Sequence, residues 1–118
     1  MKRDMDVIRK IILSVRDVDG AISSVEGIEK QNFGFHVQML EEAKLVNSSI
    51  LTGNSGKIES ARILRLTWKG EDFADVIVDD KAWKKAKENI IKKNASWTFS
   101  ILLEFLEFEA KRVILGFN

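Results

Sequence analysis

Apolar residues recur at helical spacing in the first third of the chain and predict two amphipathic helices. Residues 4–18 have one apolar stripe, formed by Val7, Ile8, Ile11, Ile12 and Val15. Residues 31–44 have another, formed by Phe33, Val37 and Leu40. Residues 21–28, between these helices, lack strict alternation, so the indication of a strand is weak, and a short helical turn or an irregular connector fits as well.

A β-hairpin is predicted after the second helix. The cluster Gly53-Asn54-Ser55-Gly56 lies between two β-prone runs, residues 49–52 and 58–67, which is typical of two strands joined by a turn. Strict alternation along the second strand would place Arg62, Leu64 and Leu66 on one side and Ile63, Arg65 and Thr67 on the other.

Three further helices are predicted, at residues 67–79, 81–93 and 97–115. Each has at or before its start a side chain that can accept hydrogen bonds from free backbone amides, and these candidate N-caps are Thr67, Asp80 and Ser96. We expect the three tryptophans to be core residues rather than stacking platforms; they are Trp68, Trp83 and Trp97.

The order of these elements predicts the fold class. A helix followed by a hairpin and another helix is the order of a winged-helix domain, in which the hairpin is the wing and the helix before it is the recognition helix. We therefore expect a mainly α protein with a small β-hairpin, folded as a single domain over residues 1–118. Residues 1–80 would form a winged helix-turn-helix core, and residues 81–118 a C-terminal helical extension.

Composition narrows the function classes. The 118 residues suit one globular domain, with 45% hydrophobic and 31% charged residues. No cysteine is present, which excludes a disulfide framework, a thiolate metal site and a cysteine nucleophile. His36 is the single histidine and is expected to be a packed or hydrogen-bonded residue. We expect no cofactor, no metal and no enzymatic activity, because no catalytic constellation is apparent.

The location and the charge pattern follow from the same sequence. No stretch reaches the roughly 18 apolar residues of a membrane span, and the start lacks a signal-peptide pattern, so we expect a cytoplasmic protein without a membrane partner. The net charge is only +1. Residues 81–118 hold eight basic and four acidic residues, so the positive charge is concentrated in the last third.

One candidate function is binding of double-stranded DNA. On the predicted recognition helix, the face opposite the apolar stripe holds Gln31, Phe35, Gln38 and Glu42. Glutamine side chains can read base edges, but no Lys or Arg lies between Gln31 and Lys44 to neutralise phosphates. The alternative is that this helix contacts protein or solvent and the winged helix is only a scaffold.

Basic residues elsewhere could assist DNA binding. The predicted wing carries Lys57, Arg62 and Arg65, and the helix at residues 81–93 has a basic face that includes Lys81, Lys84 and Lys85. The alternative for that face is the solvated side of an amphipathic helix.

The last predicted helix has apolar residues in nearly every direction around its axis. One packed face needs only about 100–140° of apolar arc, so a second face is predicted to meet another subunit or another protein. The candidate dimer or partner interface consists of Trp97, Ile101, Leu102, Phe105, Leu106 and Phe108. The alternative is a central helix with ordinary core packing.

Several segments carry a family resemblance. The most specific is Leu66-Thr67-Trp68-Lys69-Gly70-Glu71-Asp72-Phe73, and the others are residues 1–4, 8–11, 36–43, 79–83 and 96–99. On these residues the chain resembles a family of bacterial and phage proteins with a winged-helix-like core that is classed as a domain of unknown function. The resemblance implies the fold and no established activity.

A second resemblance concerns the end of the second helix. The segment from His36 to Val46 is similar to bacterial winged-helix repressors that sense metals or drugs, in which a glycine follows the alanine. Here Lys44 takes that place, so it must either adopt the left-handed conformation that glycine favours or end the helix in another way.

Overall fold

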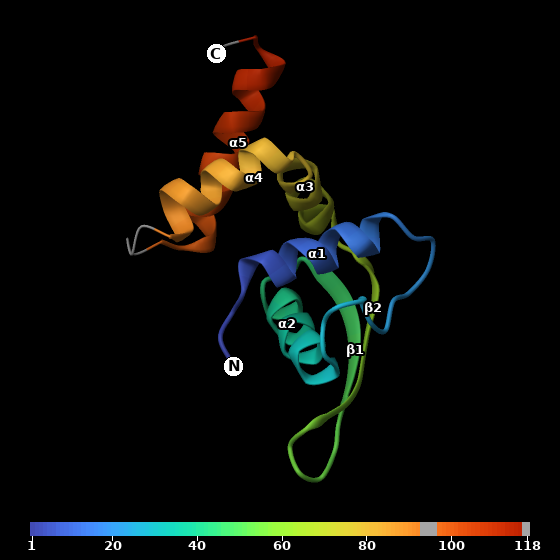
Figure 1. Ribbon diagram of the computed structural model, residues 1–118. Coiled ribbons are helices and arrows are strands. Elements are labelled where there is room, and N and C mark those ends of the chain that lie inside the picture. The colour runs from blue at the N-terminus through green and yellow to red at the C-terminus, as the bar shows by residue number, and fades with distance from the viewer. Residues whose placement is uncertain (93–96, 117–118) are drawn as a thin grey trace. The chain divides into compact units, whose positions relative to one another are not determined.

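The structure, a computed structural model, describes residues 1–92 and 97–116 (Figure 1). The helices are α1 (Met5–Arg16), α2 (Lys30–Glu42), α3 (Trp68–Ile77), α4 (Asp80–Ala86) and α5 (Phe99–Ile114), with a π-helical turn η1 (Lys87–Ile91) after α4. The strands β1 (Val46–Thr52) and β2 (Ile58–Leu66) form an antiparallel hairpin. The predicted class, mainly α with a small β-hairpin, is confirmed.

The chain divides into two compact units, residues 1–74 and residues 75–118. The boundary lies within α3, a few residues before the predicted limit between core and extension at residue 80. None of the described helices is both long enough and apolar enough to cross a membrane.

In the first unit, α1 begins where Asp4 ends the extended N-terminus. The Asp4 carboxylate accepts hydrogen bonds from the amides of Asp6 and Val7, which satisfies donors that the first helical turn leaves free. The predicted stripe is buried except for Val7, and Met5 joins it. Helix α1 packs against β2 and α2.

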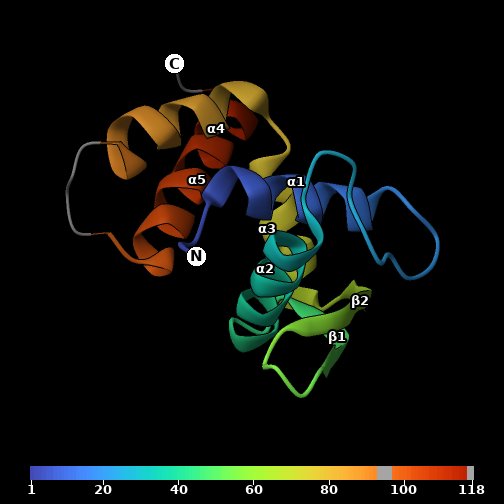
Figure 2. The same cartoon turned by 60° about the horizontal axis from the view of Figure 1, so that its bottom comes forward.

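Helix α2 lies beside the hairpin, as Figures 1 and 2 show from two directions. Its predicted stripe of Phe33, Val37 and Leu40 is buried. Gly34 is also buried, and a Cβ at this position would lie 2.7 Å from Cδ1 of Ile58. A glycine therefore lets the helix approach the start of β2.

The end of α2 is closed by Lys44. This residue adopts a left-handed backbone conformation, with φ of 62°. Its amide donates to the Glu41 carbonyl at 2.9 Å, and the Leu45 amide donates to the Leu40 carbonyl at 3.0 Å. These two bonds are those of a Schellman C-cap, so the chain turns as it would with glycine there.

The hairpin departs from the predicted strict alternation. Asn47 pairs with Arg65 and Ser48 with Ile63, so Leu64 is left over as a bulge. As a result Ile63 and Leu66 are both buried, while Leu64 and Arg65 are exposed. The prediction that Leu66 shares a side with Leu64 is wrong because the extra residue shifts the pleat.

The connector between α1 and α2 contributes a strand-like contact rather than a helical turn. Ile22 forms an isolated antiparallel bridge with Ile63, through hydrogen bonds of 3.0 Å and 2.9 Å in the two directions. The connector therefore contacts β2 at Ile22 before α2 begins.

Helix α3 is attached to the end of α2 through its N-cap. The Thr67 hydroxyl donates to the Lys44 carbonyl at 2.7 Å and accepts from the Gly70 amide at 3.0 Å, which confirms the predicted cap. A Cβ on Gly70 would overlap the Leu45 carbonyl oxygen. These contacts, with the buried Phe73, explain physically why Thr, Gly and Phe occur together in residues 66–73.

In the second unit, α4 and α5 lie side by side (Figure 2). Asp79 caps α4 by accepting from the Lys81 amide at 3.0 Å, so the predicted cap at Asp80 is one residue late. Trp83 is buried as predicted. The predicted helix 81–93 is instead α4 followed by η1, and Lys93 lies outside the described residues. Thr98 caps α5, whereas the predicted cap Ser96 lies outside the described residues.

Candidate functional site

The outward face of α2 carries the three residues predicted to face a DNA groove. Gln31, Phe35 and Gln38 are all partly exposed. The side-chain amide of Gln31 is occupied within the fold, because its nitrogen donates to the Ile58 carbonyl at 2.7 Å and its oxygen accepts from the Ile58 amide at 3.2 Å. Since both polar atoms are bonded to the backbone of β2, Gln31 joins α2 to the hairpin.

The basic residues of the hairpin differ in whether the structure shows them hydrogen-bonded within the hairpin. Lys57 and Arg62 are exposed. Arg65 donates to the Leu66 carbonyl at 2.9 Å, and with the Asn47 amide turned to satisfy both groups, it also donates to the Asn47 oxygen at 2.8 Å and 3.1 Å. Arg65 is therefore held along its own hairpin, and Lys57 and Arg62 are the basic side chains of the hairpin that can meet a ligand.

Acidic residues also lie at both ends of α2. Glu41 and Glu42 are exposed in the last turn of α2. Glu29 caps the same helix, and the amides of Gln31 and Asn32 hold the pKa of its carboxyl below the ordinary value. Residues 1–74 hold eleven basic and eleven acidic residues, so this unit has no net formal charge.

His36 is buried in α2, and its bonds define one tautomer. Its Nδ1 lies 2.9 Å from the Asn32 carbonyl and must donate to it, while its Nε2 accepts from the Asp4 amide at 2.9 Å. The expectation of a packed, hydrogen-bonded histidine is confirmed. Within residues 1–92 and 97–116, no group of three or more His, Cys, Asp or Glu side chains is placed to hold a metal.

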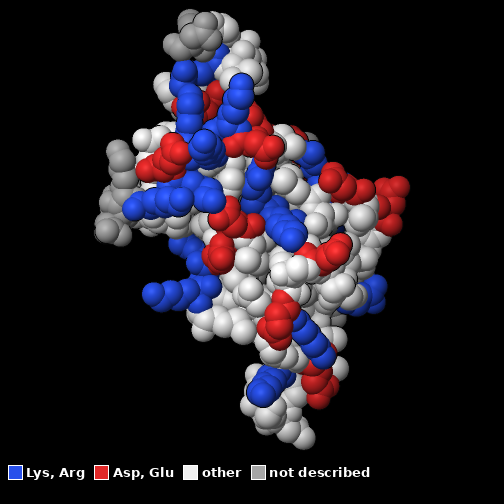
Figure 3. All heavy atoms as spheres, in the orientation of Figure 1, with Lys and Arg blue, Asp and Glu red and all other residues white. Residues whose placement is uncertain are grey.

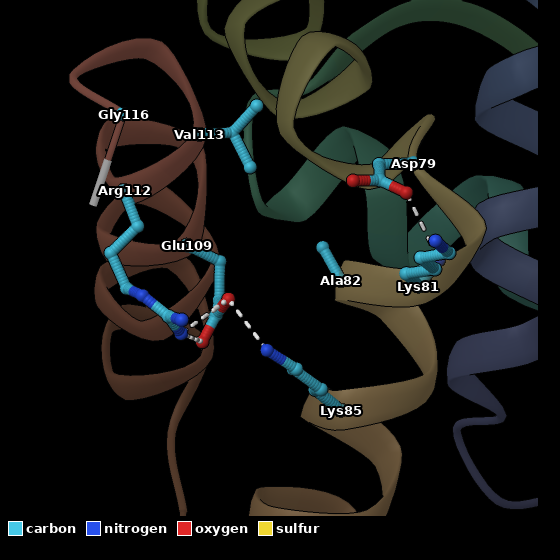
Figure 4. Close-up of a pocket in the computed structure, with 8 residues that line it drawn as sticks. All are labelled: Asp79, Lys81, Ala82, Lys85, Glu109, Arg112, Val113 and Gly116. Carbon is cyan, nitrogen blue, oxygen red and sulfur yellow. Dashed lines mark hydrogen bonds and ion pairs between the residues drawn. The ribbon is translucent and has the colours of Figure 1, made fainter. Parts of the chain in front are cut away.

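The second unit contains a cavity of about 320 Å³ beside α4 and α5, lined by Asp79, Lys81, Ala82, Lys85, Glu109, Arg112, Val113 and Gly116 (Figure 4). Glu109 is only 8% exposed. It is paired with Lys85 of α4 at 3.4 Å and with Arg112 at 3.0 Å. A buried carboxylate needs such partners. With Lys81, Lys85 and Arg112 against Asp79 and Glu109, the lining of the cavity has a formal net charge of +1.

The lysines of the predicted basic face therefore differ in whether they are paired within the chain. Lys81, Lys84 and Lys85 are all exposed, but Lys85 is bonded to Glu109. In Figure 3, Lys and Arg side chains over α4 and α5 are interspersed with Asp and Glu side chains. Residues 75–118 hold eight basic and seven acidic residues, so the unit has a formal net charge of +1.

The predicted interface on α5 also divides into two groups. Leu102 and Leu106 are 0% exposed, so they belong to the core of the chain and offer no surface to a partner. Trp97 and Phe105 are partly exposed, while Ile101 and Phe108 are 43% and 59% exposed.

Sequence reasoning missed three notable residues. Trp68 is 85% exposed at the start of α3, so the expectation that it lies in the core is wrong. Leu115, at 62% exposed, lies seven residues after Phe108 and extends the apolar side of α5. No role was predicted for Glu109; its place three positions after Leu106, on the same side of the helix, is the signal that could have indicated an acidic residue on the packed face.

Comparison with known proteins identifies the family. A family described as "Hypothetical protein (DUF2513)" matches residues 2–96, which include the first unit, α4 and η1 and end before α5. No curated protein and no solved structure matches the chain significantly. Because the match covers well over half of the residues, the chain belongs to this DUF2513 family of hypothetical proteins.

Proposed function

We propose that this chain is a protein-interaction module with a winged-helix core, and that an exposed apolar stripe of α5 is its binding surface. This α5 stripe consists of Ile101, Phe105 and Phe108 of the helix and of Leu115, the C-cap residue that follows Ile114. The observation that supports the proposal best is the 43%, 59% and 62% exposure of Ile101, Phe108 and Leu115. A helix with such a stripe commonly docks against an amphipathic helix of a partner.

The winged-helix part of the proposal is supported by the order of elements in the first unit. Helix α1, the bridging Ile22, α2, the β1–β2 hairpin and α3 follow one another as in winged-helix domains. We also propose, from the sequence, that the chain is not an enzyme and works in the cytoplasm.

A size measurement in a host-cell extract tests the interaction. We expect the wild-type chain to elute from gel filtration above its monomer mass of 13.4 kDa, and Phe108→Glu to elute as a monomer. Ile114→Glu is the matched control, because Ile114 is 80% exposed on another side of α5. A wild-type chain that elutes as a monomer would contradict the proposal, as would an Ile114→Glu variant that loses the complex equally.

Binding of double-stranded DNA is a second candidate. It is favoured by the exposure of Lys57 and Arg62 on the hairpin and by the partial exposure of Gln38 on α2. The zero net charge of residues 1–74 makes us expect weak binding.

A titration with duplex DNA at low salt decides this candidate. Lys57→Ala and Arg62→Ala should each reduce the salt dependence of log K by about 0.9, because each removes one cation that would neutralise a phosphate. Lys111→Ala on α5 should leave the salt dependence unchanged. Absence of binding at low salt would remove the candidate.

A further inference from the structure

The α5 stripe has the spacing of a coiled-coil seam. Ile101, Phe105, Phe108, Arg112 and Leu115 are separated by four, three, four and three residues, which is the alternation of d and a positions in a heptad. Leu102 and Leu106 lie on the neighbouring face, which is buried. The side of α5 that carries the seam is thus distinct from the side that packs inside the chain.

Two exposed residues of opposite charge border this seam. Glu104 and Lys111 each immediately precede an a position, so both occupy g positions of the heptad. In an antiparallel pair of helices, g positions face g positions. Two copies of α5 would therefore place Glu104 of each chain opposite Lys111 of the other.

We infer that the partner of the α5 stripe is a second copy of this chain, paired antiparallel through α5. This inference rests on the proposed function, whose partner it specifies. In the register that joins Glu104 to the partner's Lys111, Phe105 contacts the partner's Phe108. By symmetry, Phe108 contacts the partner's Phe105. The centre of the pair is then four phenylalanines, which favour edge-to-face or offset contacts.

The parallel arrangement is disfavoured by the residue in the middle of the seam. It would set Arg112 against the partner's Arg112, so that like charges meet between the two helices. In the antiparallel register Arg112 lies opposite the partner's Ile101, against which its aliphatic stem can pack.

The stripe is short, so the pair should be weak. Two heptads bury less than the roughly 1,600 Å² of a standard interface, and we expect a dissociation constant on the order of micromolar. Such a pair is reversible at ordinary laboratory concentrations, and the effect of charge reversal at its edges can therefore be measured.

Sedimentation equilibrium of the purified full-length chain tests the pairing. Glu104→Lys and Lys111→Glu should each raise the dissociation constant of the homodimer about tenfold, because two attractive pairs become repulsive. An equimolar mixture of the two variants should recover association, as should the double variant E104K/K111E. Glu107→Lys is the matched control: it makes the same charge change on α5 at an exposed position outside the seam.

Three results would overturn the inference. One is a wild-type chain that stays monomeric when pure; if it still forms a larger complex in the extract, the proposed function stands and only the self-pairing fails. Another is an equimolar mixture of Glu104→Lys and Lys111→Glu chains that fails to recover association. The third is an equal loss of association in Glu107→Lys, with circular dichroism confirming that every variant is folded.

Discussion

At the scale of single residues, two backbone positions stabilise the junction between α2 and α3. Lys44 adopts a left-handed conformation to close the C-cap of α2, and Gly70 lets the first turn of α3 approach the Leu45 carbonyl. A lysine at position 44 has a conformational cost that a glycine would not have.

Replacing Lys44 with glycine should therefore stabilise the protein. We expect Lys44→Gly to raise the free energy of unfolding by about 1 kcal/mol, since glycine adopts a positive φ without the clash of a Cβ. Urea denaturation followed by circular dichroism measures it. Ala43→Gly is the control and should destabilise by roughly 0.5–1 kcal/mol, because Ala43 has an ordinary helical φ of −76°. A destabilised Lys44→Gly variant would show that the C-cap is not the dominant effect.

Replacing Gly70 with alanine should instead lower the free energy of unfolding. The new methyl group would overlap a backbone oxygen that cannot rotate away, so we expect a loss of at least about 2 kcal/mol or failure to fold. Glu71→Ala, at the next, exposed position, should change the free energy of unfolding by only about 0.5 kcal/mol or less. Equal midpoints of urea denaturation for the two variants would refute the close approach of α3 to Leu45.

At the scale of elements, side chains of helix ends and helix faces set where each element begins and what it contacts. Glu29 caps α2, Gln31 joins α2 to β2, and Glu109 joins α5 to α4. Each of these side chains satisfies groups that would otherwise lack a partner.

The charge of Glu29 should contribute stability that depends on pH. The amides of Gln31 and Asn32 lower its pKa from the ordinary 4.5, so its contribution is present above that value and is lost as the pH falls through the folded-state pKa. We expect Glu29→Gln to have a lower urea midpoint than wild type at pH 7, and the difference to vanish in acid. A difference that persists unchanged in acid would assign the effect to something other than the carboxylate charge.

Removing Glu109 should cost less stability than removing its two basic partners, Lys85 and Arg112. The Lys85 and Arg112 side chains are 48% and 29% exposed, so they can be hydrated after Glu109→Met, which we expect to change stability by less than about 1 kcal/mol. The double variant Lys85→Met/Arg112→Met leaves the carboxylate buried without these two partners and should lose about 3 kcal/mol. Chemical denaturation of both variants measures this, and equal losses would contradict the argument.

At the scale of the whole molecule, the chain consists of two compact units whose boundary lies within α3. The first unit holds the hairpin and its two supporting helices, and the second holds α4 and α5. The formal charges nearly cancel in each unit, so the electrostatic attraction to nucleic acid expected from the last third is reduced.

A defect in the core of the second unit should remain local. Leu106 is fully buried in α5, and Leu106→Ala should cost about 2–5 kcal/mol there. Native-state hydrogen exchange should then show reduced protection in α4 and α5, with α1 and the hairpin retaining theirs. Reduced protection to the same extent in α1 would show that the two units unfold as one.

Features that depend on a few neighbouring residues were predicted from the sequence, and features that depend on distant contacts were not. The buried stripes of α1 and α2 and the cap at Thr67 followed from local spacing alone. The grouping of Leu64 with Leu66, which alternation predicted, was wrong, because a bulge depends on how β2 pairs with β1. The exposure of Trp68 was missed because its position follows from the docking of Thr67 and Gly70, not from its own hydrophobicity.

By itself, the sequence determined the helical order, the hairpin and the absence of any cysteine chemistry, because apolar periodicity and turn residues act over a few neighbouring positions. Only the tertiary structure decided which candidate side chains are available. It committed Gln31, Arg65 and Lys85 to partners within the chain, buried Leu102 and Leu106, and left Ile101, Phe108 and Leu115 exposed. The reason is physical: a side chain is exposed or paired according to what packs beside it, and those neighbours are distant in sequence.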